Sequence, residues 1–115
     1  MRRAARVDAN QSSIVELLRS IGCLVQDLSA VGHGSPDLLV WHPRTGLFLV
    51  EVKAGDQPLS RQSLTAAERA FHLAWSSAPL YIVNSDASAM AAFEDSERCN
   101  TPTVQSVAST HWECH

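Results

Sequence analysis

The sequence predicts a single α/β domain in which helices flank a mixed sheet. The chain has 115 residues, of which 45% are hydrophobic, and this is enough for one modest core but not for two. Its hydrophobic pattern indicates, in order, a helix, three strands, a second helix and a fourth strand. No internal repeat or low-complexity tract interrupts this order. We therefore expect one compact unit built around one sheet.

The first helix is predicted to begin near Asp8 or Asn10, either of which can cap it. It should end at Gly22, because glycine readily takes the left-handed conformation that follows a helix. Gln11 falls on the buried side of this helix and Glu16 on the opposite side. The apolar stripe that defines the buried side consists of Ile14, Val15, Leu17, Leu18 and Ile21.

Three strands are predicted after this helix, over residues 23–28, 37–41 and 47–53. The turn-forming residues 42–46 join the second and third strands as a hairpin. A second helix is predicted from Thr65 through Trp75, with Thr65 as the N-cap and Glu68 completing a capping box. A fourth strand is expected over residues 79–83.

The C-terminal part of the chain carries weaker signals. Ser85 or Asp86 can cap a short helix that runs through Phe93. From Glu94 the periodicity fades into polar residues, and residues 103–107 are predicted as a late strand. We therefore expect a folded domain over residues 1–95 and a C-terminal extension over residues 96–115 that is partly mobile.

Three residues near the hairpin carry the strongest functional signal. Asp37 begins the second predicted strand, and Glu51 follows it by fourteen residues in the third. Because side chains alternate along a strand, Glu51 and Lys53 lie on the same face, and pairing of the two strands brings Asp37 close to Glu51. Two carboxylates and a neighbouring lysine suit a metal-dependent phosphodiesterase, which needs oxygen ligands for Mg²⁺ and a cation near the phosphate.

These residues resemble the signature of the PD-(D/E)XK nuclease superfamily, with Pro36-Asp37 and Glu51-Val52-Lys53 as its two halves. The chain looks most like the small VRR-NUC nucleases and the Holliday-junction resolvases, through the order of elements from about Asp8 to Val83 and the glycine-rich turn at 31–35. The resemblance implies a restriction-endonuclease-like core of order αβββαβ. It also implies Mg²⁺-dependent cutting of DNA, often of branched or structured DNA.

The resemblance also assigns roles at the site. Asp37, Glu51 and the main-chain carbonyl of Val52 would hold Mg²⁺, for which Mn²⁺ substitutes, while zinc is disfavoured because the ligands are oxygens. Lys53 would act either as a base or as an electrostatic clamp, and the sequence leaves both roles open. In the resolvases a glutamate in the first helix joins the metal site, and Gln11 takes its place here. Gln11 is therefore either a neutral ligand that supports a weaker second metal or a helix-capping residue.

The charge distribution bears on DNA binding. The formal net charge is −3 and the pI is about 5.9, which is opposite to the usual basic footprint of a nucleic-acid-binding domain. We therefore expect weak, salt-sensitive binding by one chain, with a homodimer or a partner supplying the rest. The candidate DNA-binding residues are Arg2, Arg3, Arg6, His33, Ser35, Arg61 and Gln62.

Several of these candidates have an equally ordinary interpretation. His33, Arg61 and Gln62 can each be solvated loop residues. We interpret Glu68 as a capping residue rather than a catalytic acid, and His72 as a packed or exposed helix residue rather than a ligand.

No segment approaches the ~20 consecutive apolar residues that span a bilayer, and residues 1–6 are not followed by an apolar signal-peptide stretch. We expect a cytoplasmic protein without a membrane partner, located in the host cytoplasm if a phage encodes it. The predicted function is that of a phage-type, Mg²⁺-dependent endonuclease of replication, recombination or repair. The alternative is a nuclease-like module that binds DNA or a protein without cutting.

Overall fold

The structure, a computed structural model, describes residues 2–100, with side chains from residue 7 onward. Its helices are α1 (Arg2–Ser20), α2 (Ala66–Ala74) and α3 (Asp86–Asn100), and a 3₁₀ turn, η1, covers Arg61–Ser63. The strands are β1 (Leu24–Asp27), β2 (Leu38–His42), β3 (Gly46–Val52) and β4 (Leu80–Val83). Within this described part, no helix is long and apolar enough to cross a membrane.

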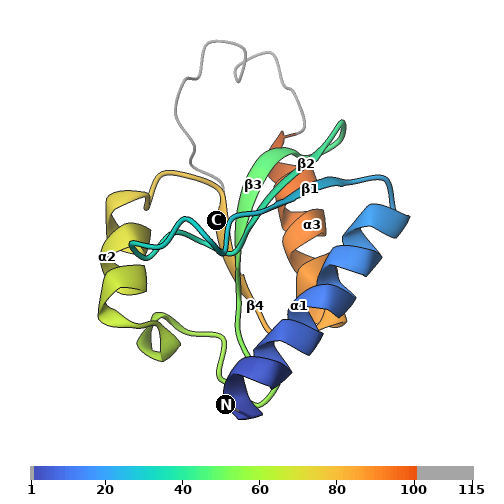
Figure 1. The fold of residues 1–115 in the computed structure, drawn as a ribbon. Coiled ribbons are helices and arrows are strands. Elements are labelled where there is room, and N and C mark those ends of the chain that lie inside the picture. The colour runs from blue at the N-terminus through green and yellow to red at the C-terminus, as the bar shows by residue number, and fades with distance from the viewer. Residues whose placement is uncertain (1, 101–115) are drawn as a thin grey trace.

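The four strands form one mixed sheet in the order β1-β2-β3-β4. β1, β2 and β3 pair antiparallel, whereas β4 runs parallel to β3. The parallel pair requires a long crossover connection, which the segment containing η1 and α2 supplies. α1 and α3 lie on one side of the sheet and α2 on the other (Figure 1). The predicted α/β domain with a mixed sheet flanked by helices is therefore confirmed.

The hydrophobic core lies between the sheet and the α1–α3 pair. Alternate residues of β2 and β3 point to this side, because side chains on a strand alternate between its faces. The core consists mainly of Ile14, Leu18, Leu38, Val40, Phe48, Val50, Val52, Val83, Ala89, Ala92 and Phe93. Glu51 lies between two of these core residues in the chain, so its side chain points to the other face, toward α2.

The end of α1 and the start of α2 confirm their predicted caps. Gly22 has a φ of +99°, in the left-handed region that favours glycine. Thr65 caps α2, and the capping box with Glu68 is complete. Both signals are local, since each depends on residues within a few positions of the helix end.

Two predicted helix boundaries are wrong. α1 begins at Arg2, so Asp8 and Asn10 lie within the helix rather than at its start. α3 continues past Phe93 to Asn100, because Ser96 is buried and its Oγ donates a hydrogen bond to the carbonyl of Thr45 at 3.4 Å. A small polar residue on the packed face had hidden the helical periodicity. The predicted boundary between residues 1–95 and 96–115 thus falls inside α3, and the strand predicted at 103–107 lies outside the described residues.

Candidate active site

The hairpin brings the two predicted carboxylates together. In the β2–β3 register, Leu38 is opposite Val50, so Asp37, one residue earlier, comes next to Glu51. The main-chain N–H of Val52 donates a hydrogen bond to Asp37 Oδ2 at 2.7 Å. The Asp37 carboxyl group therefore accepts a hydrogen bond from the main chain of β3 just beyond the last paired residues of β2 and β3. Strand pairing thus places this carboxyl group at the site.

The Glu51 side chain is almost completely buried, with 2% of the residue exposed. Burial raises the pKa of Glu51 to about 10, and the charge of Asp37 and a hydrogen bond between the two carboxyl groups act in the same direction. Burial also raises the pKa of Asp37, against the hydrogen bond from Val52, which favours the charged form. The fold thus holds two carboxyl groups that resist carrying negative charge together.

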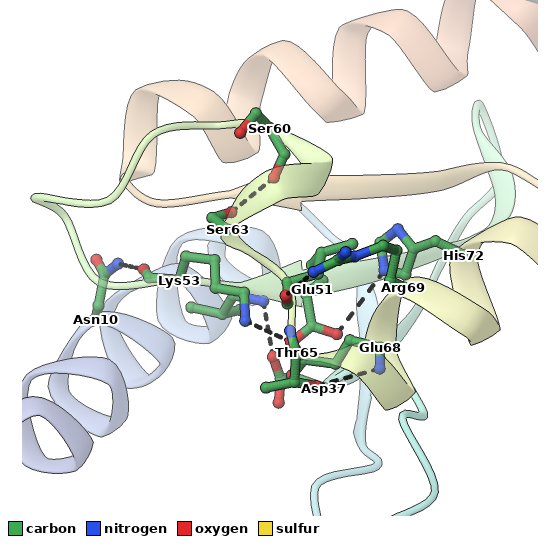
Figure 2. Close-up of polar contacts among 12 residues, drawn as sticks. Asn10, Asp37, Glu51, Lys53, Ser60, Ser63, Thr65, Glu68, Arg69 and His72 are labelled. Carbon is green, nitrogen blue, oxygen red and sulfur yellow. Dashed lines mark hydrogen bonds and ion pairs between the residues drawn. The ribbon is translucent and has the colours of Figure 1, made fainter.

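Lys53 lies beside this pair, as the strand alternation predicts. Its Nζ is 3.9 Å from Glu51 Oε2 and 2.7 Å from Glu68 Oε1. Figure 2 shows Asp37, Glu51, Lys53 and Glu68 converging between β3 and the start of α2. The ammonium group is therefore held by a carboxylate from α2 while it faces the acidic pair on the sheet.

Glu68 has two roles, and sequence reasoning found one of them. Its Oε1 accepts a hydrogen bond from the main-chain N–H of Thr65 at 2.8 Å, which completes the capping box. The same oxygen binds Lys53. Burial opposes ionisation of Glu68, but the hydrogen bonds from Lys53 and Thr65 prevail and lower its pKa. The prediction of a capping residue is confirmed, and the contact with Lys53 was not predicted from the sequence.

Gly34 sets how closely α2 approaches the site. Its φ is +79°, and a Cβ built on it would lie 2.2 Å from the main-chain oxygen of Ala67. No side chain fits there without moving the first turn of α2. The glycine-rich turn before Pro36 therefore lets α2 place Glu68 against Lys53.

Asn10 anchors the end of β3 from the other side. Its Nδ2 donates hydrogen bonds to the main-chain oxygens of Lys53 at 2.7 Å and Asn84 at 2.8 Å. These contacts link α1 to the chain segments that leave β3 and β4. Sequence reasoning treated Asn10 only as a helix cap, and its position in the middle of a helix, where asparagine is unfavourable, is the signal that indicates this tertiary role.

His72 is also buried at the site. Its Nε2 lies 4.0 Å from Glu51 Oε1, and the two side chains are each 3% exposed. Among the described side chains, these two atoms are buried without a hydrogen-bond partner, a state that costs ~1–3 kcal/mol for each group. Burial and the charge of Arg61 lower the pKa of His72, which favours the neutral ring. The buried position of His72 agrees with the packed form of the predicted helix residue, whereas its approach to Glu51 was not predicted.

Gln11 belongs to α1, and its side chain contacts the end of β1. Its Nε2 is 3.3 Å from Asp27 Oδ2 and 3.3 Å from Ser29 Oγ. It lines a cleft of about 620 Å³ between α1 and β1 that also includes Asp8, Glu16 and Arg19. These contacts engage the amide nitrogen of Gln11, and its role as a metal ligand stays a prediction.

The predicted DNA-binding residues come from α1, the glycine-rich turn and η1. His33, Arg61 and Gln62 are exposed, and His33 has a φ of +58° in the glycine-rich turn. Ser35 is half-buried and its Oγ contacts the main-chain oxygen of Pro36 at 3.3 Å. Arg2, Arg3 and Arg6 lie in α1, and their side chains are outside the described part. The role of each in binding DNA stays a prediction.

The donor groups at the site suit a hard divalent cation. Asp37 and Glu51 supply carboxyl oxygens, and a bound cation would favour the charged forms that burial disfavours when it raises their pKa values. Over the described residues, no three or more His, Cys, Asp or Glu side chains form a metal-binding group. Mg²⁺ commonly uses only one or two carboxylates and completes its shell with water and substrate phosphates. The residues present therefore fit Mg²⁺ better than zinc.

The fold and the site together define a nuclease-type domain of the PD-(D/E)XK class, which implies DNA as the substrate. A family model described as the VRR-NUC domain matches residues 3–68, which is more than half of the chain and includes Asp37, Glu51, Lys53 and Glu68. The chain therefore belongs to the VRR-NUC family. No curated protein and no solved structure matches it.

Proposed function

We propose that this protein is a Mg²⁺-dependent endodeoxyribonuclease that hydrolyses phosphodiester bonds in DNA. The observation that carries the proposal is the contact between the half-buried Asp37 carboxyl group and the buried Glu51 carboxyl group, with Lys53 Nζ 3.9 Å from Glu51. A domain that only binds DNA has no physical need for this costly arrangement. Membership of the VRR-NUC family supports nuclease activity. The identity of the metal and the preferred form of DNA are part of the proposal.

In this proposal residues of the sheet bind the metal, and a residue of α2 positions Lys53. Asp37, Glu51 and the main-chain carbonyl of Val52 would hold Mg²⁺, which when bound polarises the phosphate and lowers the pKa of attacking water. Glu68 holds Lys53 through a charge-assisted hydrogen bond of 2.7 Å. An ammonium group held in this way is a positioned positive charge. We infer that Lys53 acts on the phosphate as an electrostatic clamp rather than as a base.

The substrate and assembly follow from the resemblance to resolvases and from charge. We propose branched or structured DNA, such as a four-way junction, as the preferred substrate in replication, recombination or repair. A net charge of −3 supports weak binding by one chain. A homodimer would double the contacts with DNA and place two cuts symmetrically. We also propose a cytoplasmic location, which is the cytoplasm of the host if a phage encodes the protein.

A second candidate is a module that binds DNA or a protein without cutting. The acidic net charge and the neutral Gln11 at the position of a resolvase glutamate favour it. It predicts that the Asp37→Asn and Lys53→Gln variants bind the partner as well as wild type does.

The test is cleavage of labelled four-way junction, flap, single-stranded and linear duplex DNA in Mg²⁺, Mn²⁺ or chelator. Wild type is compared with Asp37→Asn and Lys53→Gln, and the exposed Glu94→Gln serves as a charge-matched control. We expect metal-dependent cutting that each site variant lowers by about 10²-fold or more and that the control retains. Folded wild type that binds these DNAs and cuts none of them in either metal would contradict the proposal. Sedimentation of the same samples tests the dimer.

A further inference from the structure

His72 reverses the usual pattern of an amphipathic helix. Within α2, which is described throughout, His72 is the buried residue, whereas Leu73 is 71% exposed and Trp75 is 49% exposed. A helix on the surface of a domain ordinarily turns leucine and tryptophan inward and leaves histidine outside. General core packing therefore does not account for the inward position of His72.

The inward side chain approaches Glu51, whose Oε1 atom also lacks a hydrogen-bond partner. His72 Nε2 and Glu51 Oε1 are 4.0 Å apart, and among the described side chains they are the buried polar atoms without a hydrogen bond. Figure 2 shows His72 reaching from α2 toward Glu51 on β3. A hydrogen bond between them needs a separation of about 2.9 Å, so a movement of about 1 Å joins the two atoms.

The two carboxyl oxygens of Glu51 have different neighbours. Its Oε2 is on the side of Lys53, at 3.9 Å from Nζ, while Oε1 is the oxygen near His72. We propose that His72 is a positioning residue for Glu51, whose Nε2–H donates a hydrogen bond to Oε1 and leaves Oε2 free to bind the cation with Asp37. This inference rests on the proposed function, and it assigns to α2 the orientation of a ligand on β3.

The structure separates this role from that of a direct ligand. His72, Asp37 and Glu51 do not form a metal-binding group of three, and no other set of described residues does. His72 therefore acts through Glu51. Residues that hydrogen-bond to metal ligands fix the orientation of those ligands, and their loss typically lowers metal affinity or activity by about 10- to 100-fold. The match to the VRR-NUC model ends at residue 68, so the geometry alone assigns this role.

The test measures Mn²⁺ binding by calorimetry without DNA, followed by single-turnover cleavage. The variants are His72→Phe, which fills the space without a donor, and His72→Gln, whose Nε2 extends as far along the side chain as that of histidine. The exposed Leu73→Ala on the same helix is the control. We expect His72→Phe to weaken Mn²⁺ binding by about 10- to 100-fold, His72→Gln to keep most of the affinity, and the control to match wild type.

Equal Mn²⁺ affinity of His72→Phe and wild type would overturn the positioning role, as would equal losses in the Phe and Gln variants. If His72→Phe does not fold, His72→Asn replaces it. Asparagine is one bond too short to reach Oε1, so equal affinity of the Asn and Gln variants would overturn the role. Folded wild type that neither binds Mn²⁺ nor cuts DNA would overturn the proposed function together with this inference. A wild type that does both, beside an unaffected His72→Phe, would overturn only the inference.

Discussion

The two faces of the sheet differ in what their residues do for the protein. The face toward α1 and α3 is closely packed and apolar, with Val40 and Leu38 fully buried. The face toward α2 holds Glu51 and Lys53, and it leaves Trp41 and Leu47 at 40% and 56% exposure. A single strand, β3, serves both faces through alternate residues. Packing on one face stabilises the fold, whereas holding ionisable groups close together on the other face lowers its stability.

The largest expected effect comes from the packed face. Phe48→Ala removes a buried aromatic ring that packs in a T-shaped arrangement with Tyr81, with ring centroids 5.8 Å apart. We expect a loss of ~3–5 kcal/mol in the free energy of unfolding, measured by urea denaturation, because the deletion leaves a cavity in the core. A loss below ~1 kcal/mol would show that this face does not carry the stability of the fold.

The next effect tests how α2 is placed over the other face. Gly34→Ala puts a Cβ 2.2 Å from the main-chain oxygen of Ala67, whereas Gly32→Ala, at a similarly positive φ, meets nothing within 4 Å. We expect Gly34→Ala to cost ~1–3 kcal/mol more than Gly32→Ala, since the clash must displace α2. Urea denaturation measures the difference, and cleavage should fall only in the Gly34 variant. Equal effects of the two changes would mean that backbone strain, and not the approach of α2, limits both.

Part of this organisation could be predicted from sequence. The proximity of Asp37, Glu51 and Lys53 could be predicted because strand alternation and a hairpin turn are local patterns. The helix-end roles of Gly22 and Thr65 could be predicted for the same reason. The contacts of Glu68 with Lys53, of His72 with Glu51 and of Asn10 with Asn84 join residues far apart in the chain, and the hydrogen bonds of the first and the last span 15 and 74 positions. No local pattern encodes such contacts. Glu68 was further obscured because it satisfies a capping box at the same time.

The fold should gain stability when the buried carboxyl group of Glu51 on the α2 face is replaced by an amide. Glu51→Gln keeps the shape of the side chain and removes a carboxyl group whose pKa burial raises to about 10. At pH 7.5 without metal, we expect the free energy of unfolding to rise by at least ~1.4 kcal/mol, the equivalent of one pKa unit, while cleavage is lost. A destabilised Glu51→Gln with normal unfolding cooperativity would contradict the view that this face is held against its own repulsion.

The same pKa shift sets a pH dependence. The folded pKa of Glu51 lies above the ordinary value of 4.5, so between these values the folded state binds more protons than the unfolded state. The free energy of unfolding of metal-free wild type should therefore fall as the pH rises from about 5 to about 8. Denaturant unfolding across this range should show a shallower fall for Glu51→Gln. An equal slope in both proteins would assign the dependence to other groups.

The smallest effect is expected on the open part of the α2 face. Leu47 lies on β3 beside Phe48 and is 56% exposed. Leu47→Ala should change the free energy of unfolding by no more than ~0.5 kcal/mol, as is usual for exposed positions. Urea denaturation beside Phe48→Ala gives the matched comparison. A large loss from Leu47→Ala would show that this part of the face is covered.

The most direct test of the account is unfolding of wild type and Glu51→Gln at pH 7.5, each with and without Mg²⁺ or Mn²⁺. A cation that binds the folded state alone stabilises it by mass action, by about 2.7 kcal/mol at a hundred times its Kd. The account predicts that the cation stabilises wild type and leaves Glu51→Gln nearly unchanged, because the variant has lost one of the two carboxylates. Equal stabilisation of the two proteins, or none in wild type, would contradict the claim that Asp37 and Glu51 form a cation site.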